Sequence, residues 1–154
     1  MAAAAAEIQR LINESQSNGD YVGGGMRWPV PGYGNISSYY GEVRNINGVR
    51  DVHTGIDIPA PTGTPMVAAN SGVVKYVRYY NSGYGYHLLI DHGGGNYTLY
   101  GHCSKILVTA GQTVQKGDTI ALVGATGRVT GPHLHFEVYE NKVRTNPLNF
   151  VKYS

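Results

Sequence analysis

The sequence predicts an all-β fold, and three observations support that prediction. Glycine (22) and tyrosine (13) are both abundant among the 154 residues, as is typical of short strands joined by tight turns. After Met26 the chain consists of short alternating segments separated by Gly, Asn and Pro, which is the pattern of strands and turns. That part contains no long amphipathic helical pattern. We therefore expect an antiparallel sheet, a sandwich or an open barrel.

The first 25 residues differ from the rest of the chain. Ile8, Leu11 and Ile12 recur at the spacing of one helix face, and the alanines at 2–6 favour a helix. Residues 13–25 are polar and end in three glycines, which is typical of a linker. We therefore predict a short N-terminal helix outside the domain, a helical tail and Gly-rich linker at 1–25, and a folded domain at 26–154.

Within the domain, the turn residues separate short segments that alternate between polar and apolar side chains. The glycines at 93–95 lie between two such segments and predict a β-hairpin. The strands predicted in this way are 64–69, 73–80, 86–91, 96–100, 113–114, 119–123, 133–139 and 142–144.

Composition excludes several classes of protein. The net charge is +2 and the pI about 8.6, without a cluster of Lys and Arg, so we expect no nucleic-acid partner. The single cysteine, Cys103, excludes a disulfide framework. No apolar stretch approaches the ~18–20 residues of a membrane span, so we expect no membrane insertion within this sequence. Residues 2–6 lack the basic start and long apolar run of a signal peptide. No pattern specifies an oligomeric state.

The first candidate site is a histidine and a carboxylate four residues apart, His53 and Asp57. In a straight strand these positions lie ~13 Å apart, which is too far for both to bind one ion. If both bind one metal, the chain must bend between them, and Gly55 is the natural position for the bend. The alternative is an exposed histidine followed by a turn aspartate.

The second candidate is the pair His133 and His135, on a predicted strand. Residues i and i+2 of a strand point the same way, with ~6.5–7 Å between them. This distance is wide for two ligands of one ion and suits a division of labour, with one metal ligand and one catalytic base. The alternative is two histidines on a solvated face.

The remaining histidines give weaker signals. His102 follows a predicted strand, where a lone histidine is more often structural or exposed. His92 is expected in a turn, and His87 is expected to face solvent because it alternates with Leu88. The first two candidates together supply two imidazoles and one carboxylate, which leave a fourth zinc position for water. A helical HExxH zinc motif and paired cysteines are both absent from the sequence.

These motifs, in this order, resemble those of the lysostaphin-like (LytM-type) zinc metallopeptidases. The resemblance covers about residues 26–151 and extends well past the histidines. It includes Arg44 with the segment 36–41, the segment HTGIDIPAPTGTPMVAANSGVV (53–74), the segment YGHCSKILVTAGQTVQKGDTIALVGATGRVTGPHLHFEVY (100–139) and the segment NPLNF (146–150).

The resemblance implies a role for each of five residues. It makes His53, Asp57 and His135 the ligands of one Zn²⁺ ion, and His102 and His133 the catalytic pair. It also implies a β-rich fold in which a central antiparallel sheet forms an open groove. Tyr79, Tyr80, Tyr84 and Tyr86, with Tyr33, Tyr39 and Tyr40, are candidates for the groove wall.

The activity implied is zinc-dependent endopeptidase cleavage of peptide cross-links or stem peptides of bacterial peptidoglycan. Peptidoglycan is then the partner, and the location is extracytoplasmic, in the cell envelope, periplasmic or secreted. The alternative is a non-catalytic cell-wall-binding or regulatory module of the same fold that activates other wall hydrolases. All five residues are present, which favours the enzyme. The segment 111–124 also resembles the hairpin of biotin- or lipoyl-carrier domains, but no lysine-bearing tip motif follows it.

Overall fold

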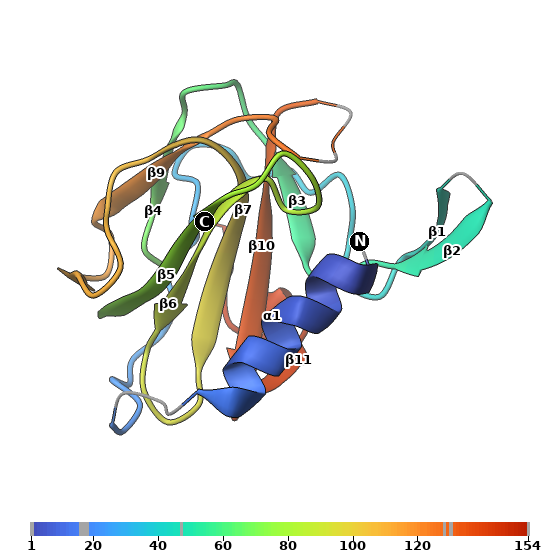
Figure 1. Ribbon diagram of the computed structural model, residues 1–154. Helices are drawn as coiled ribbons and strands as arrows, with labels where there is room; N and C mark the ends of the chain where they lie inside the picture. The colour runs from blue at the N-terminus through green and yellow to red at the C-terminus, as the bar shows by residue number, and fades with distance from the viewer. Residues whose placement is uncertain (1, 16–18, 47, 128, 130, 154) are drawn as a thin grey trace.

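The computed structural model describes residues 2–15, 19–46, 48–127, 129 and 131–153. Figure 1 shows a twisted sheet, with one helix lying across a face of it and a two-stranded hairpin projecting from the body. The elements are α1 (Ala2–Glu14), β1 (Val43–Ile46), β2 (Val49–Val52), β3 (Ile56–Pro59), β4 (Pro65–Val67), β5 (Gly72–Tyr79), β6 (Tyr86–Asp91), β7 (Tyr97–Ile106), β8 (Thr113–Val114), β9 (Thr119–Val123), β10 (His133–Glu140), β11 (Val143–Thr145) and the 3₁₀ helix η1 (Pro147–Asn149).

The main sheet is antiparallel in all its pairings. Its strands follow the order β11-β10-β7-β6-β5-β8, while β3 pairs with β10, β9 pairs with β7, and β4 pairs with β9. Strands β1 and β2 form the separate projecting hairpin. The predicted all-β class and its central antiparallel sheet are confirmed. That the sheet forms an open substrate groove stays a prediction.

Strand β7 joins two parts of this sheet. Its first half, Tyr97 to Gly101, pairs with β10, and its second half, from Cys103 onward, pairs with β9. Between the two halves lies His102, whose φ of +63° is in the left-handed region. A non-glycine residue seldom adopts this conformation, and strained backbone of this kind is concentrated at functional sites. The change of partner therefore occurs at one of the predicted site residues.

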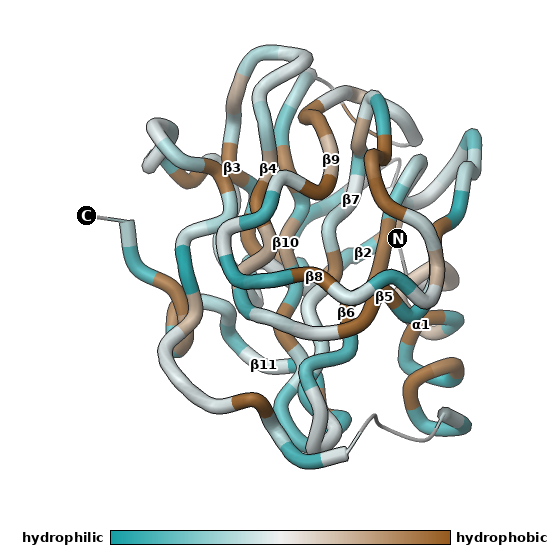
Figure 2. Tube along the Cα trace, turned by 90° about the vertical axis from the view of Figure 1, so that its left-hand side faces the viewer, coloured by the Kyte–Doolittle hydropathy of each residue, from teal (hydrophilic) through white to brown (hydrophobic). Residues whose placement is uncertain are grey.

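Side chains alternate between the two faces of the sheet along each strand, and both faces carry a buried hydrophobic cluster. On β6, Leu88 belongs to the larger hydrophobic cluster, with Trp28 and Phe136, whereas its neighbour Leu89 belongs to a second cluster on the other face. Figure 2 shows the resulting concentration of hydrophobic segments within the strands. The second cluster contains Ile8, Ile12, Tyr76, Tyr84, Leu89, Tyr97, Leu99 and Tyr139.

The expectation that helix α1 lies outside the domain is wrong for this structure. Ile8 and Ile12 are only 2% and 0% exposed, because the helix packs its apolar stripe onto the second face of the sheet. Several of the sheet residues that receive it are tyrosines, whose rings form an apolar surface although their hydroxyls are polar. Division of the chain into 1–25 and 26–154 stays a prediction. Among the described residues, no helix has the length and hydropathy needed to cross a membrane.

Candidate metal centre

A bend in the backbone brings His53 and Asp57 together. Strand β2 ends at Val52 and β3 begins at Ile56, with a bend at Gly55. Nε2 of His53 lies 3.1 Å from Oδ1 of Asp57. A Cβ at position 55 would lie 2.2 Å from the backbone oxygen of Phe136 on β10. Only glycine therefore allows the chain to pass this close to β10, and the bend expected at Gly55 is present.

Strand pairing adds His135 to the same point. Asp57 and His135 are direct partners in the antiparallel pairing of β3 with β10, so their side chains project to one face. Nδ1 of His135 lies 3.0 Å from Oδ1 of Asp57 and 3.2 Å from Nε2 of His53. One ligand atom from each residue falls within 4.8 Å of the others, and all three residues are buried. Two imidazole nitrogens and one carboxylate oxygen fit a zinc ion that keeps an open position.

In both His53 and His135, the ring nitrogen that faces away from Asp57 has a partner of its own. Nδ1 of His53 is 3.0 Å from the backbone oxygen of Tyr39, and Nε2 of His135 is 2.8 Å from Oε2 of Glu137. A neutral ring donates its N–H to such an acceptor and leaves the opposite nitrogen free to bind metal. His53 would therefore bind through Nε2 and His135 through Nδ1.

His102 and His133 form a second pair beside these three residues. Their ring centroids are 4.9 Å apart, and Nε2 of His133 lies 3.5 Å from Oδ1 of Asp57. Nδ1 of His102 donates to the backbone oxygen of Thr126 at 2.7 Å, and Nδ1 of His133 donates to that of Gly131 at 2.9 Å. A carbonyl can only accept, so in the neutral ring Nε2 carries the lone pair. Both rings are therefore held as bases.

Electrostatics keep this second pair neutral. Burial, together with the nearby His135 and His133, lowers the pKa of His102 to about 3. Burial also lowers the pKa of His133, against the attraction of Asp57. Both imidazoles are therefore unprotonated near neutral pH, with the lone pair on Nε2.

Two of the three grouped residues, His135 and Asp57, have pKa values shifted toward their charged forms. Burial alone would lower the pKa of His135, but hydrogen bonds with Asp57 and Glu137 outweigh burial and raise it to about 9. Burial would likewise raise the pKa of Asp57, but hydrogen bonds from His135 and His53 hold it well below its usual range. Asp57 therefore stays ionised, and its negative charge favours a cation at the point where the three residues meet.

All five predicted site residues lie together in the structure, including His102, which had the weakest signal in the sequence. Glu137, which is 0% exposed behind His135, was not among the residues predicted from the sequence. It stands two residues after His135 on the same strand, so the periodicity that linked His133 to His135 could have found it.

Two other expectations from the sequence are wrong. His87 was expected to face solvent but is 1% exposed, with its ring against Tyr76, Tyr80 and Tyr84. The reason is that both faces of β6 are covered. Tyr84 was a candidate for the groove wall, but it is also 1% exposed and its hydroxyl bonds to Glu137. The role of the more exposed tyrosines in a groove stays a prediction.

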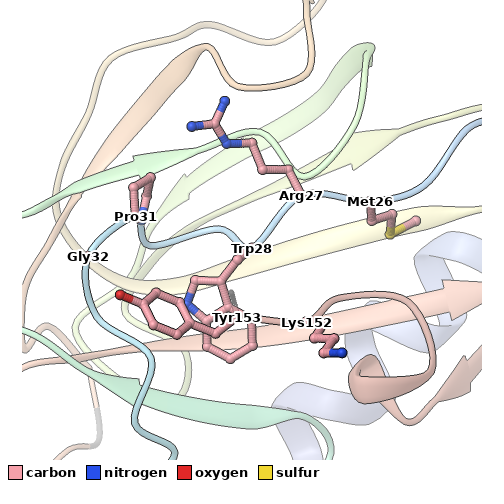
Figure 3. Close-up of a pocket in the computed structure, with 7 residues that line it drawn as sticks. All are labelled: Met26, Arg27, Trp28, Pro31, Gly32, Lys152 and Tyr153. Carbon is pink, nitrogen blue, oxygen red and sulfur yellow. The ribbon is translucent and has the colours of Figure 1, made fainter.

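A cavity of about 420 Å³ lies elsewhere, where residues 26–32 meet the end of the chain (Figure 3). The rings of Trp28 and Tyr153 lie beside each other there, with centroids 5.7 Å apart, whereas Arg27 and Lys152 extend to different sides of them. The two cations therefore do not converge on one ligand position. Its lining contains none of the five site residues and consists of Met26, Arg27, Trp28, Pro31, Gly32, Lys152 and Tyr153.

Known proteins match both the sequence and the fold. Peptidoglycan DD-endopeptidase ShyA of Vibrio cholerae is 43% identical over 131 residues, which cover 82% of this chain and 29% of ShyA. A zinc-containing peptidase from Vibrio cholerae superimposes with a TM-score of 0.73 at 38% identity, covering 79% of this chain and 39% of that one. Lysostaphin, the antimicrobial peptidase from Staphylococcus simulans, superimposes with a TM-score of 0.66 at 30% identity. The match covers 76% of this chain and 48% of the lysostaphin chain.

The chain spans less than a third of the length of the curated relatives it matches, with 29% coverage of ShyA as an example. The sequence model of peptidase family M23 matches residues 51–147, a segment that contains all five predicted site residues. Together with the similarity to lysostaphin, this match confirms the family that the motifs resembled. The chain belongs to peptidase family M23, a family of metallopeptidases.

Proposed function

We propose that this chain is the catalytic domain of a zinc-dependent endopeptidase that hydrolyses peptide cross-links or stem peptides of bacterial peptidoglycan. The observation that carries the proposal is the convergence of His53, Asp57 and His135 beside a second pair of neutral histidines. The name of ShyA as a peptidoglycan DD-endopeptidase supports the substrate class. A wall substrate places the activity outside the cytoplasm, in the cell envelope.

In this proposal one Zn²⁺ ion is held by His53, Asp57 and His135. A donor set of two imidazoles and one carboxylate is typical of catalytic zinc sites, and one structural relative is described as zinc-containing. When bound, zinc supplies Lewis-acid chemistry, which polarises the scissile carbonyl and lowers the pKa of a bound water to about 7.

The second pair of histidines supplies the proton transfers. Nε2 of His102 or of His133 accepts the proton of the attacking water, since both nitrogens carry a lone pair near neutral pH. That ring, now protonated on Nε2, then gives the proton to the leaving amine. Only a ring protonated on Nε2 can also donate a hydrogen bond to the charge that develops on the carbonyl oxygen. The backbone acceptors at Thr126 and Gly131 hold the two rings in place during these steps.

The experiment is mass spectrometry of fragments released from purified peptidoglycan sacculi, with and without a chelator. We expect chelator-sensitive release of shortened or separated peptide stems, and the fragment masses identify the bond that is cut. If protein shown to contain zinc releases nothing from sacculi of several cross-link types, the domain is not an endopeptidase on its own. That result would favour a regulatory module that activates other wall hydrolases.

A further inference from the structure

Glu137 is a fully buried carboxylate directly behind the candidate metal centre. It lies on β10 two residues after His135 and is 0% exposed. Its Oε2 lies 2.8 Å from Nε2 of His135 and accepts hydrogen bonds from the hydroxyls of Thr54 (2.6 Å) and Tyr84 (2.5 Å). Thr54 follows His53 in the chain, so this one oxygen contacts the chain segments that carry both candidate histidine ligands.

The other carboxylate oxygen is held just as firmly. Oε1 accepts hydrogen bonds from the hydroxyl of Tyr139 (2.6 Å) and from Nε of Arg144 (3.2 Å). Arg144 also donates from Nη2 to the backbone oxygen of Ala5 at 3.0 Å, so helix α1 helps to fix the guanidinium. Both oxygens therefore have fixed partners, and the carboxylate cannot rotate away from His135 without breaking several hydrogen bonds.

A buried ion pair is weak evidence for stability, because the cost of removing both charges from water can exceed their attraction. The arrangement has a clearer consequence for the ring of His135. A carboxylate accepts only, so it selects the form of the ring with a proton on Nε2. Nδ1 is then the nitrogen that faces Asp57 and His53, where a metal ligand is needed.

We propose that Glu137 is a positioning residue for the metal centre: its hydrogen bond to Nε2 holds His135 in the orientation and tautomer that present Nδ1 to the ion. Hydrogen-bonded carboxylates behind histidine ligands serve this purpose in metalloproteins generally, and their loss weakens metal binding by about 10–100-fold. The inference rests on the proposed metal site, but it can be tested without any peptidase assay.

The test compares the full chain with its Glu137→Gln variant. Affinity for Zn²⁺ alone is measured by competition with a chelator of known affinity, and the melting temperature of each metal-free protein is recorded. The matched control is Thr98→Val on β7. Thr98 is also 0% exposed, and its hydroxyl is 2.7 Å from both His92 Nε2 and Tyr100 Oη, outside the candidate site. The control should melt at a lower temperature but bind Zn²⁺ as the wild type does.

We expect Glu137→Gln to bind Zn²⁺ about 10–100-fold more weakly, whatever its melting temperature. Unchanged affinity in Glu137→Gln, or an equal loss in Thr98→Val, would overturn the proposal. If the wild type binds no Zn²⁺, both this inference and the proposed function fail. If the wild type binds it and Glu137→Gln binds it equally well, only the role of Glu137 fails.

A second measurement on the wild type guards against a variant that does not fold. Long-range ¹H–¹⁵N NMR of the Zn²⁺-bound protein identifies which nitrogen of His135 carries the proton. We expect the proton on Nε2. A proton on Nδ1, with Nε2 bound to the ion, would contradict the proposal directly.

Discussion

At the scale of single residues, His135 differs from His102 and His133 in what its ring nitrogens contact. His102 and His133 donate to backbone carbonyls and carry no close carboxylate on Nδ1, whereas His135 lies between Asp57 and Glu137. The first arrangement leaves a ring neutral and ready to accept a proton. The second holds a ring where it binds a cation. The chemistry assigned to these three histidines therefore follows from their partners rather than from their residue type.

His133→Ala tests this division of roles. The variant should lose about 10²–10⁴-fold in kcat, which is the usual contribution of a general acid or base. It should retain its bound metal, because Nε2 of His133 lies 3.5 Å from Asp57 outside the group of three. Turnover of isolated stem peptides measures the loss of kcat, and mass spectrometry measures the zinc content. A variant that loses its zinc would show that His133 is a ligand.

Asp57→Ala is the complementary change. Oδ1 of Asp57 contacts both candidate histidine ligands, so its removal should weaken Zn²⁺ binding by more than the ~10–100-fold expected for an outer partner. Activity should fall in parallel at limiting zinc. Competition with a chelator measures the affinity, and His133→Ala is the control that keeps the ion. Normal zinc affinity in Asp57→Ala would mean that the ion is bound elsewhere.

The raised pKa of His135 makes zinc binding depend on pH. Because that pKa is about 9 without an ion, the ring is protonated at pH 7 and must release its proton when metal binds. Affinity for Zn²⁺ should therefore increase with pH up to about 9. The same raised pKa stabilises the metal-free fold below about pH 6.5, the unfolded value, and this contribution is lost as pH rises toward about 9. Calorimetry in two buffers of different ionisation enthalpy measures the released protons. A proton count near zero at pH 7 would contradict the shift.

At the scale of elements, alternation of side chains predicted several strands well. Residues 86–91 and 119–123 coincide with β6 and β9, and residues 133–139 fall one short of β10. The β1–β2 hairpin was not predicted. Only one of the four residues of β2 is buried, so the strand shows no alternation of buried and exposed side chains. β7 was expected to end at Tyr100 but continues past His102. A strand that crosses a left-handed residue and changes partners leaves no signal in local periodicity.

Helix α1 also shows that a local sequence pattern does not reveal its distant packing partners. Its amphipathic stripe was evident in the sequence, but the surface that receives the stripe was not, because tyrosine side chains of distant strands build it. Ile12→Ala should destabilise the metal-free protein by about 2–5 kcal/mol, the cost of removing a buried isoleucine side chain. Arg10→Ala, in an exposed ion pair on the same helix, should cost less than about 1 kcal/mol. Equal effects in urea denaturation would place the helix outside the domain, as the sequence predicted.

At the scale of the whole molecule, the candidate site is assembled from segments far apart in the sequence. His53 and Asp57 flank a bend, His102 lies where β7 changes partners, and His135 lies on β10. The five residues could be predicted because their local motifs together resemble those of a known family. Their distances could not, because they depend on the pairing of β3 with β10 and on the close passage of Gly55 beside Phe136.

An ion bound to His53, Asp57 and His135 connects the bend before β3 to β10, so it binds the folded chain far better than the unfolded one. At a free Zn²⁺ concentration about 100 times its Kd, this linkage adds about 2.7 kcal/mol to the free energy of unfolding. For a chain of this size, each kcal/mol raises Tm by about 2–4 °C, so Tm should rise by roughly 5–11 °C. A chelator should reverse the shift, and Asp57→Ala should abolish it at the same zinc concentration. A shift that persists in Asp57→Ala would place the stabilising ion away from the β3–β10 pairing.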